Sequence, residues 1–309
     1  DFSGSGVIYS ATFTPSVNGI CTFIVPSNSY TSNIGKSNEE SNLFTWSFSS
    51  IINTSTTITQ EISNSYTYPV TINGGTSAVP VVITVNEDLI INLGTSAYFI
   101  LGSEYITIEG NDKTVTIDNV PNYPGLIQNG TNSVGASTNI TINNIGIISS
   151  GSTTLADYGG WLCQSYFGNR ISNGKLTIQN CYSTGAISGS KSGGICGSEY
   201  GQNASGGTLI IENCYSTGVI SGSGSGGICG SGYGFQNLGG KFEVNNCYST
   251  GEISESGSGG ICGSDYGFQN LGGTLTIQNC YSTGAINGSE SGGICGASYG
   301  AFSSGTFTI

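Results

Sequence analysis

The sequence predicts an all-β protein: a parallel β-helix, or β-solenoid, of about seven coils with a β-rich N-terminal cap. Three observations predict this fold. Two motifs recur every 33 residues, a short alternating apolar motif precedes each copy of the first, and glycine-rich turns separate short runs of β-branched and aromatic residues. A fixed period of a few tens of residues is typical of solenoids, in which each unit stacks on the one before it. No stretch has the sustained 3.6-residue period of an amphipathic helix.

The two repeated motifs set the predicted coil. Asn-Cys-Tyr-Ser-Thr-Gly begins at Asn180, Asn213, Asn246 and Asn279, and Ser-Gly-Gly-Ile-Cys-Gly begins at Ser192, Ser225, Ser258 and Ser291. If one repeat is one coil, neighbouring coils rise by about 4.8 Å and seven coils stand about 35 Å tall. Three short strands need fewer than 33 residues, so we expect loops to bulge at 189–191 and 199–206. Two short coils per repeat are the alternative.

The alternating motif predicts one strand in each coil. It reads Leu-Thr-Ile-Gln-Asn from Leu176 and is expected at 176–180, 209–213, 242–246 and 275–279, with earlier versions at 70–74, 106–110 and 140–144. Alternation turns Leu176 and Ile178 to the interior, where copies stack. We therefore expect a solenoid over 70–309, with irregular coils over 70–175 and regular repeats over 176–309. Because Phe307 begins another copy, we expect the natural protein to continue beyond Ile309.

Residues 1–69 carry no repeat. Their alternating or aromatic-rich stretches, 6–13 and 43–48, predict a β-rich segment that caps the first coil. A solenoid needs its open edge covered to avoid end-to-end aggregation. The alternative interpretation is an attachment segment that docks the protein onto a larger assembly.

Asparagine and cysteine are expected to form ladders along the axis. Stacked Asn side chains at a turn can hydrogen-bond from coil to coil. The predicted asparagine ladder comprises Asn180, Asn213, Asn246 and Asn279. The predicted cysteine ladders comprise Cys181, Cys214, Cys247 and Cys280, and Cys196, Cys229, Cys262 and Cys295.

Three interpretations of the cysteines compete. A metal site is disfavoured because the chain has no His and no Cys-x-x-Cys, so we predict no metal and no cofactor. A disulfide within each coil would suit a secreted or surface protein. Stacked Cβ atoms about 4.8 Å apart are too distant for a relaxed bridge along a ladder. We favour free, buried thiols packed as small apolar side chains.

Tyrosine also recurs in two rows. Tyr182, Tyr215, Tyr248 and Tyr281 form one, and Tyr200, Tyr233, Tyr266 and Tyr299 form the other. Coil-to-coil stacking explains regularly spaced aromatic residues. The functional alternative is a glycan-binding platform, for which the second row is the candidate.

The sequence contains little that indicates a catalytic site. The chain lacks His, and its six Lys and Arg residues are spread over its length, which disfavours lyase and pectinase-like chemistry. A carboxylate pair is the remaining acid/base option. The candidates are Glu104, Glu109, Asp112 and Asp118, and we favour the alternative that these are solvated strand and turn residues.

The amino-acid composition disfavours nucleic acid as a partner and gives no sign of a membrane span. The net charge is −12, and nucleic acid binding needs clustered cations that this chain lacks, so we expect no nucleic acid partner. No apolar run of about 18 residues predicts a membrane span. The negative charge is read as a solubility feature.

The motifs Cys-Tyr-Ser-Thr-Gly-x-Ile and Gly-Gly-Ile-Cys-Gly resemble GLUG-type repeats, and residues 70–309 resemble right-handed parallel β-helix proteins. The resemblance implies bacterial surface proteins such as adhesins, or virion proteins of large DNA viruses. It implies the fold more strongly than the function, because β-helices also carry lyases, hydrolases and tail fibres.

We therefore expect a non-enzymatic structural protein in a virion, filament or cell-envelope assembly, located extracellularly at a cell or virion surface. Its expected partners are copies of itself or other structural proteins. The alternatives are an adhesin that binds surface glycans and an enzyme that cleaves polysaccharides.

Overall fold

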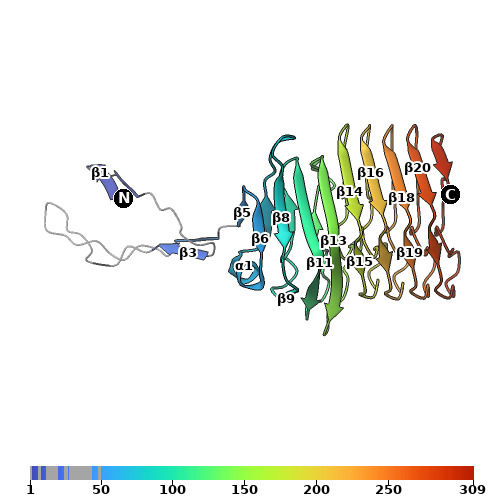
Figure 1. The fold of residues 1–309 in the computed structure, drawn as a ribbon, viewed down its shortest axis with the longest axis horizontal. Coiled ribbons are helices and arrows are strands. Elements are labelled where there is room, and N and C mark those ends of the chain that lie inside the picture. The colour runs from blue at the N-terminus through green and yellow to red at the C-terminus, as the bar shows by residue number, and fades with distance from the viewer. Residues whose placement is uncertain (1, 6–7, 12–19, 24–26, 28–43, 48–49) are drawn as a thin grey trace.

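A computed structural model of the chain describes residues 2–5, 8–11, 20–23, 27, 44–47 and 50–309. From residue 50 onward the chain winds into a stack of coils whose strands lie side by side in parallel (Figure 1). This is the predicted β-solenoid, and about seven coils follow residue 70. The described residues contain a single helix, α1 (Gln60–Ser65), which Thr59 caps by accepting a hydrogen bond from the Ile62 amide.

The N-terminal strands are antiparallel. β1 (Phe2–Ser5) pairs with β2 (Ile8–Ala11), and β3 (Ile20–Phe23) pairs with β4 (Phe44–Ser47). The predicted role of residues 1–69 as a cap or attachment segment depends largely on residues before 50 that lie outside the described ones.

Three rows of parallel strands run along the axis. The first row contains β6 (Thr56–Ile58), β8 (Val81–Val85), the first part of β11 (Ile106–Asp118) and of β13 (Ile140–Ser150), β14 (Lys175–Gln179), β16 (Thr208–Glu212), β18 (Lys241–Asn245), β20 (Thr274–Gln278) and β22 (Thr306–Thr308). The second contains β9 (Leu89–Ile91), the ends of β11 and β13, β15 (Tyr182–Ser183), β17 (Tyr215–Ser216), β19 (Tyr248–Ser249) and β21 (Tyr281–Ser282).

The third row begins as strands and continues as a cysteine ladder. It contains β5 (Ile51–Ile52), β7 (Val70–Ile72), β10 (Phe99–Leu101) and β12 (Ile127–Gln128). From Ile127 the pairing passes to Cys163 and then to Cys196 and its repeats through single bridges. The regular repeats therefore replace this strand by one paired residue per coil.

The structure corrects the register of the early coils. Ile106 pairs with Val81, whereas Val70 pairs with Phe99 in the third row, so the predicted equivalence of the motifs at 70 and 106 is wrong. Both segments alternate apolar and polar residues, and alternation does not reveal which row a strand joins. Parallel stacking also begins at Ile51, well before the predicted boundary at 70.

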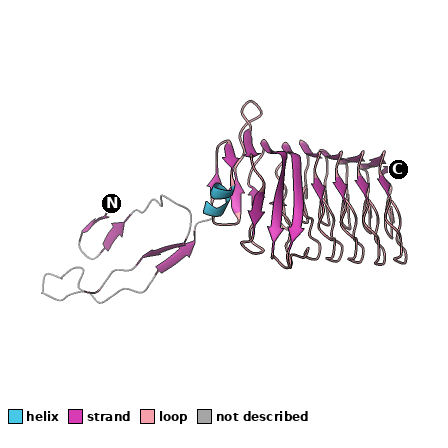
Figure 2. Cartoon of the chain, turned by 60° about the horizontal axis from the view of Figure 1, so that its bottom comes forward, coloured by secondary structure: helices cyan, strands magenta, loops and turns pink. Residues whose placement is uncertain are grey.

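The expected bulging loops are also absent from the regular coils. Residues 189–191 and 199–206 form turns that stack on the next coil: the Lys191 amide donates to Ser223 O at 2.8 Å, and the Glu199 amide donates to Ser231 O at 2.8 Å. Neighbouring coils run side by side over their full contour (Figure 2). Because Leu176 pairs with Leu209, one repeat is one coil, which excludes two short coils per repeat.

The interior is a continuous column of stacked apolar side chains. Leu176, Ile178, Leu209 and Ile211 are fully buried, as alternation predicts. A cavity of about 20 Å³ between the N-terminal coils is lined only by apolar side chains. A cavity this small leaves no room for a ligand inside the column.

Asparagine occupies the corner between the first and second strand rows. The Asn180, Asn213, Asn246 and Asn279 backbones have φ of 53–54°, the left-handed region. Amide groups bond along the axis: Asn213 Nδ2 donates to Asn180 Oδ1 at 3.3 Å, and Asn180 Nδ2 donates to Asn144 Oδ1 at 3.0 Å. The ladder thus extends one coil beyond the repeated motif.

We expect Asn213→Ala to lower the free energy of unfolding by about 1–2 kcal/mol, because alanine is strained in the left-handed region and breaks the amide ladder. Asn213→Gly removes the same amide without the strain and is the control. Urea denaturation followed by circular dichroism measures both. Equal loss in the two variants would mean that the backbone conformation contributes nothing.

Candidate functional site

The cysteines form two interior ladders. The nine described cysteines are free thiols, and only Cys280 and Cys295, in the last coil, are not fully buried. Cysteines of neighbouring coils bond to each other along a ladder: the backbone N–H of Cys214 donates to Cys247 Sγ at 3.4 Å. Burial raises the pKa of the Cys196 and Cys229 thiols well above the usual range, so they stay protonated. Protonated thiols are poor nucleophiles and poor metal ligands.

In the described part of the chain, no group of three or more His, Cys, Asp or Glu side chains is arranged to hold a metal ion.

The second tyrosine row lies inside the solenoid. Tyr200, Tyr233 and Tyr266 are 0–1% exposed, and their rings stack at centroid distances of 5.3–5.4 Å with interplanar angles of 3–5°. Only Tyr299, in the last coil, reaches 40% exposure. The expectation that Tyr200, Tyr233, Tyr266 and Tyr299 form a glycan platform is therefore wrong, because three of the four rings are inaccessible.

The first tyrosine row lies on the outside of the second strand row. Tyr182, Tyr215 and Tyr248 are half-buried, and ring centroids along the row lie 4.9–5.2 Å apart with planes 3–5° from parallel. Rings stacked in this way cover each other's faces and present their edges to solvent. A sugar that packs on the face of an aromatic ring therefore finds no free face between the stacked rings, although Tyr281, in the last coil, is 52% exposed.

Three of the four predicted carboxylates, Glu104, Glu109 and Asp118, accept hydrogen bonds from the next coil. Glu104 accepts a hydrogen bond from Thr138 Oγ1 at 2.8 Å, and Asp118 accepts one from Ser150 Oγ, both donors lying one coil further along. Asp112 is exposed beside the bend in β11. Asparagine amides also donate to two of these acids: Asn139 Nδ2 to Glu104 Oε2 at 3.4 Å, and Asn119 Nδ2 to Asp118 Oδ2 at 2.9 Å.

Glu109 is held as a carboxylate. Burial raises its pKa, but hydrogen bonds from Asn144 Nδ2 at 2.8 Å, the Asn111 amide at 3.1 Å and Asn143 Nδ2 at 3.1 Å together bring the pKa below the usual range. A general acid needs a raised pKa. Glu109 therefore lacks the protonation that a general acid of the predicted pair requires.

A carboxyl group that the sequence did not single out has a raised pKa. Burial raises the pKa of Glu199 to about 7; the charge of Lys191 and a hydrogen bond from Gln202 oppose this effect, and the charge of Asp265 adds to it. The carboxyl group lies over the neighbouring coil at Gly232, where an added Cβ would come within 2.9 Å of it. The sequence signal is the row Glu199, Gly232, Asp265, in which glycine leaves the space between two acids.

We expect the free energy of unfolding to fall as the pH rises from the ordinary pKa of Glu199 to its raised pKa in the folded protein. Between about pH 4.5, its ordinary pKa, and about pH 7, the folded protein keeps a proton that the unfolded chain releases. The loss is complete above about pH 7 and amounts to roughly 3 kcal/mol. Melting temperatures of Glu199→Gln should lack this fall, whereas the exposed control Glu255→Gln should keep it. The same pH profile in all three proteins would refute the assignment.

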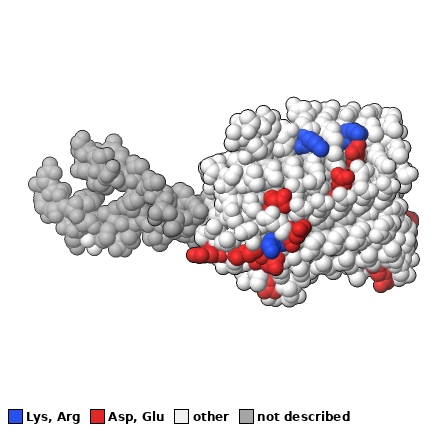
Figure 3. Space-filling model, viewed as in Figure 1, with Lys and Arg blue, Asp and Glu red and all other residues white. Residues whose placement is uncertain are grey.

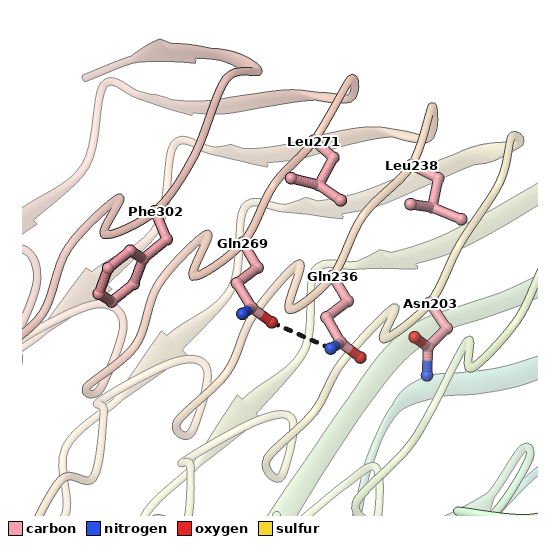
Figure 4. A pocket seen from close by; sticks show the side chains of 6 residues that line it. All are labelled: Asn203, Gln236, Leu238, Gln269, Leu271 and Phe302. Atoms are coloured by element: carbon pink, nitrogen blue, oxygen red, sulfur yellow. Dashed lines mark hydrogen bonds between the residues drawn. The ribbon is translucent and has the colours of Figure 1, made fainter.

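A surface groove crosses the C-terminal coils. It has a volume of about 500 Å³ and is lined by Asn203, Gln236, Leu238, Gln269, Leu271 and Phe302. Figure 4 shows Asn203, Gln236, Gln269 and Phe302 in one row on successive coils, with Leu238 and Leu271 in a second row beside it. We call this surface the amide–leucine groove. It lies on the turn between the cysteine row and the first strand row.

Buried asparagines shape the turns that carry the groove. Asn237 Oδ1 accepts from the Gly240 amide at 2.7 Å, and Asn237 Nδ2 donates to Gly240 O at 2.9 Å; Asn270 makes the same pair of bonds with Gly273. These contacts close the turn over the fully buried asparagine. The flanking leucines then lie outside, where Leu238 is 53% and Leu271 is 54% exposed.

A sequence signal for the groove exists in the differences between repeats. The turn reads Tyr-Gly-Phe-Gln-Asn-Leu-Gly-Gly from Tyr233 and from Tyr266, but Tyr-Gly-Gln-Asn-Ala-Ser-Gly-Gly from Tyr200. Leu238 and Leu271 thus stand where the turn that begins at Tyr200 has the polar residue Ser205. Only stacking of the coils shows that they form one surface.

Comparison with known proteins identifies no relative. No family model matches the sequence, and neither a curated protein nor a solved structure is significantly similar to it. No helix in the described part of the chain has the length and apolarity needed to cross a membrane.

Proposed function

We propose that this chain is a non-enzymatic structural protein, a rigid rod in a virion, filament or cell-envelope assembly at an extracellular surface. The observation that carries the proposal is the set of axial contacts in the regular coils. Strands and turns bond to the next coil, aromatic rings stack on it, and asparagine amides bond in two pairs, Asn180 with Asn213 and Asn246 with Asn279. Such a column resists bending and leaves few exposed backbone groups for proteases.

Surface chemistry also favours a structural role. Charged side chains are sparse on the face shown in Figure 3, and the acidic ones gather mainly towards the N-terminal coils. Glu104 and Asp118 accept hydrogen bonds from the next coil, and seven of the nine described cysteines are buried. Repeated motifs that resemble GLUG-type repeats of surface proteins are in keeping with this role. The proposed partners are further copies of this chain or other structural proteins.

The polysaccharide-cleaving alternative has a direct test. The purified protein should release no reducing ends and no unsaturated products from a broad polysaccharide panel. Cleavage that disappears in Glu109→Gln or Asp118→Asn would replace the structural proposal with an enzymatic one.

The structural role is tested by locating the protein in its source. Intact particles or cell envelopes are fractionated, washed with high salt and probed with an antibody against residues 50–309. We expect the protein in the assembled fraction at a fixed ratio to other components, protected from protease. Recovery as a free monomer in the wash would overturn the proposal.

A further inference from the structure

The amide–leucine groove has the chemistry of a binding site for a carbohydrate chain. We propose that it binds a neutral, linear polysaccharide that lies along the solenoid axis. This binding function goes beyond the structural role and does not depend on it. The inference is carried by the charge, the exposed apolar surface, the amides and the direction of the groove.

The groove is uncharged on an acidic protein. None of its six lining residues carries a charge, whereas the whole chain has a net charge of −12. An anionic polymer would be repelled by the protein and would find no cation in the groove. A cationic polymer would find no carboxylate among the lining residues. A neutral ligand meets neither penalty.

Phe302 supplies an exposed aromatic ring to the groove. Its side chain is 79% exposed, and its ring lies at 72° to the ring of Phe268, with centroids 5.4 Å apart. In contrast, Phe235 and Phe268 stack 6° from parallel in the same way as the tyrosines. The turned ring presents an accessible surface to the groove, on which the C–H face of a sugar can pack beside the exposed leucines.

The amides supply hydrogen bonds suited to hydroxyl groups. Gln236 Nε2 donates to Gln269 Oε1 at 3.0 Å, which fixes both side chains in the row (Figure 4). Gln236 Oε1 and Gln269 Nε2 have no protein partner among the described residues, so one acceptor and one donor remain for a ligand. Sugar hydroxyls both donate and accept, and they can pair with either group.

The backbone of the groove disfavours a peptide as the occupant. A peptide is commonly bound by adding a strand to a free sheet edge. Here the backbone N–H groups of the turn already bond between coils. The backbone N–H of Gln236 donates to Phe268 O at 3.0 Å, and that of Leu271 donates to Asn237 O at 2.8 Å. Recognition must therefore use side chains, which repeat along the axis as the units of a polysaccharide do.

The groove spans four successive coils from Asn203 to Phe302. Three steps of about 4.8 Å give a length of about 14 Å, which accommodates a short stretch of an extended sugar chain. A periodic surface along the axis favours a polymer over a single small sugar.

The test uses the chain as it is, with oligosaccharides of about three to six units, the shortest of which matches a groove of about 14 Å. The probes are cello-, manno-, xylo- and chito-oligosaccharides, screened on an array and then titrated by calorimetry. The variants are Leu271→Ser and Phe302→Gln, because other repeats already carry Ser205, Ser304, Gln236 and Gln269 at these positions. Folding is therefore preserved. Tyr281→Ala, which removes an exposed ring outside the groove, is the control.

We expect at least one neutral oligosaccharide to bind, with affinity at least about tenfold weaker in Leu271→Ser and Phe302→Gln and unchanged in Tyr281→Ala. No binding to any neutral glycan, or binding that both groove variants retain, would overturn the proposal. Preferential binding of charged glycans or of peptides would overturn it as well. None of these outcomes alters the test of the structural role, which depends on where the protein is found.

Discussion

Gly227→Ala is expected to lower the free energy of unfolding by at least about 3 kcal/mol. A Cβ at this position would lie 2.1 Å from the carbonyl oxygen of Gly260 in the next coil and 2.6 Å from Ser249 Cβ. Neither atom belongs to a flexible chain end, so the clash is relieved only by separating the coils. Separation would break the bond from the Gly227 amide to Gly259 O. Urea denaturation followed by circular dichroism measures the loss.

The repeat supplies a matched control for this substitution. Gly293 occupies the equivalent position in the last coil, where the nearest atom to an added Cβ is Ile286 Cδ1 at 3.8 Å. Gly293→Ala should therefore leave stability within about 1 kcal/mol of the parent, because the space is open and alanine reduces the freedom of the unfolded chain. Equal destabilisation by Gly227→Ala and Gly293→Ala would show that coil-to-coil contact is not the cause.

Tyr233→Ala is expected to cost about 3–5 kcal/mol. The ring is fully buried and stacks against Tyr200 at 5.3 Å and Tyr266 at 5.4 Å, so its removal leaves a cavity between three coils. Tyr248→Ala removes a half-buried ring from the outer row and should cost much less, about 1 kcal/mol. Thermal and urea denaturation of both variants provide the comparison.

Removing only the hydroxyl of Tyr233 separates the contribution of ring packing from that of polar contacts. Tyr233 Oη is buried and has no hydrogen-bond partner in the described structure. Tyr233→Phe should therefore be neutral, or should raise stability by about 1 kcal/mol, because it removes an unsatisfied polar group. Phe167 already stacks on Tyr200 at 5.9 Å in the same row. A loss in Tyr233→Phe as large as in Tyr233→Ala would mean that the hydroxyl has a role the packing does not show.

The period of the sequence predicts stacking but only partly predicts orientation. Leu176 and Leu209 pair as expected because both the period and the alternation place them. Tyr200 lies in a turn where Gly201 has a positive φ, so no two-residue alternation shows which way its ring points. Tyr182 is in a strand, and its neighbour Ser183 is buried, which places Tyr182 outside.

Functional surfaces were harder to predict for the same reason. The amide–leucine groove combines residues from four coils, and the raised pKa of Glu199 depends on burial by the neighbouring coils and on the nearby charges of Lys191 and Asp265. Neither effect is visible within one repeat. Likewise, the alternating motif at Val70 resembles that at Ile106, and only the three-dimensional register assigns it to another row.

We propose that this solenoid serves as a rigid component of an assembly. Cryo-electron microscopy of the native material, imaged in its source particle or filament, is the decisive measurement. We expect copies packed in a regular array against one another or against a shell, with the coil stack straight and its sides in contact with neighbours. Isolated monomers that project freely, without repeated contacts, would contradict a structural role and would leave ligand binding as the principal function.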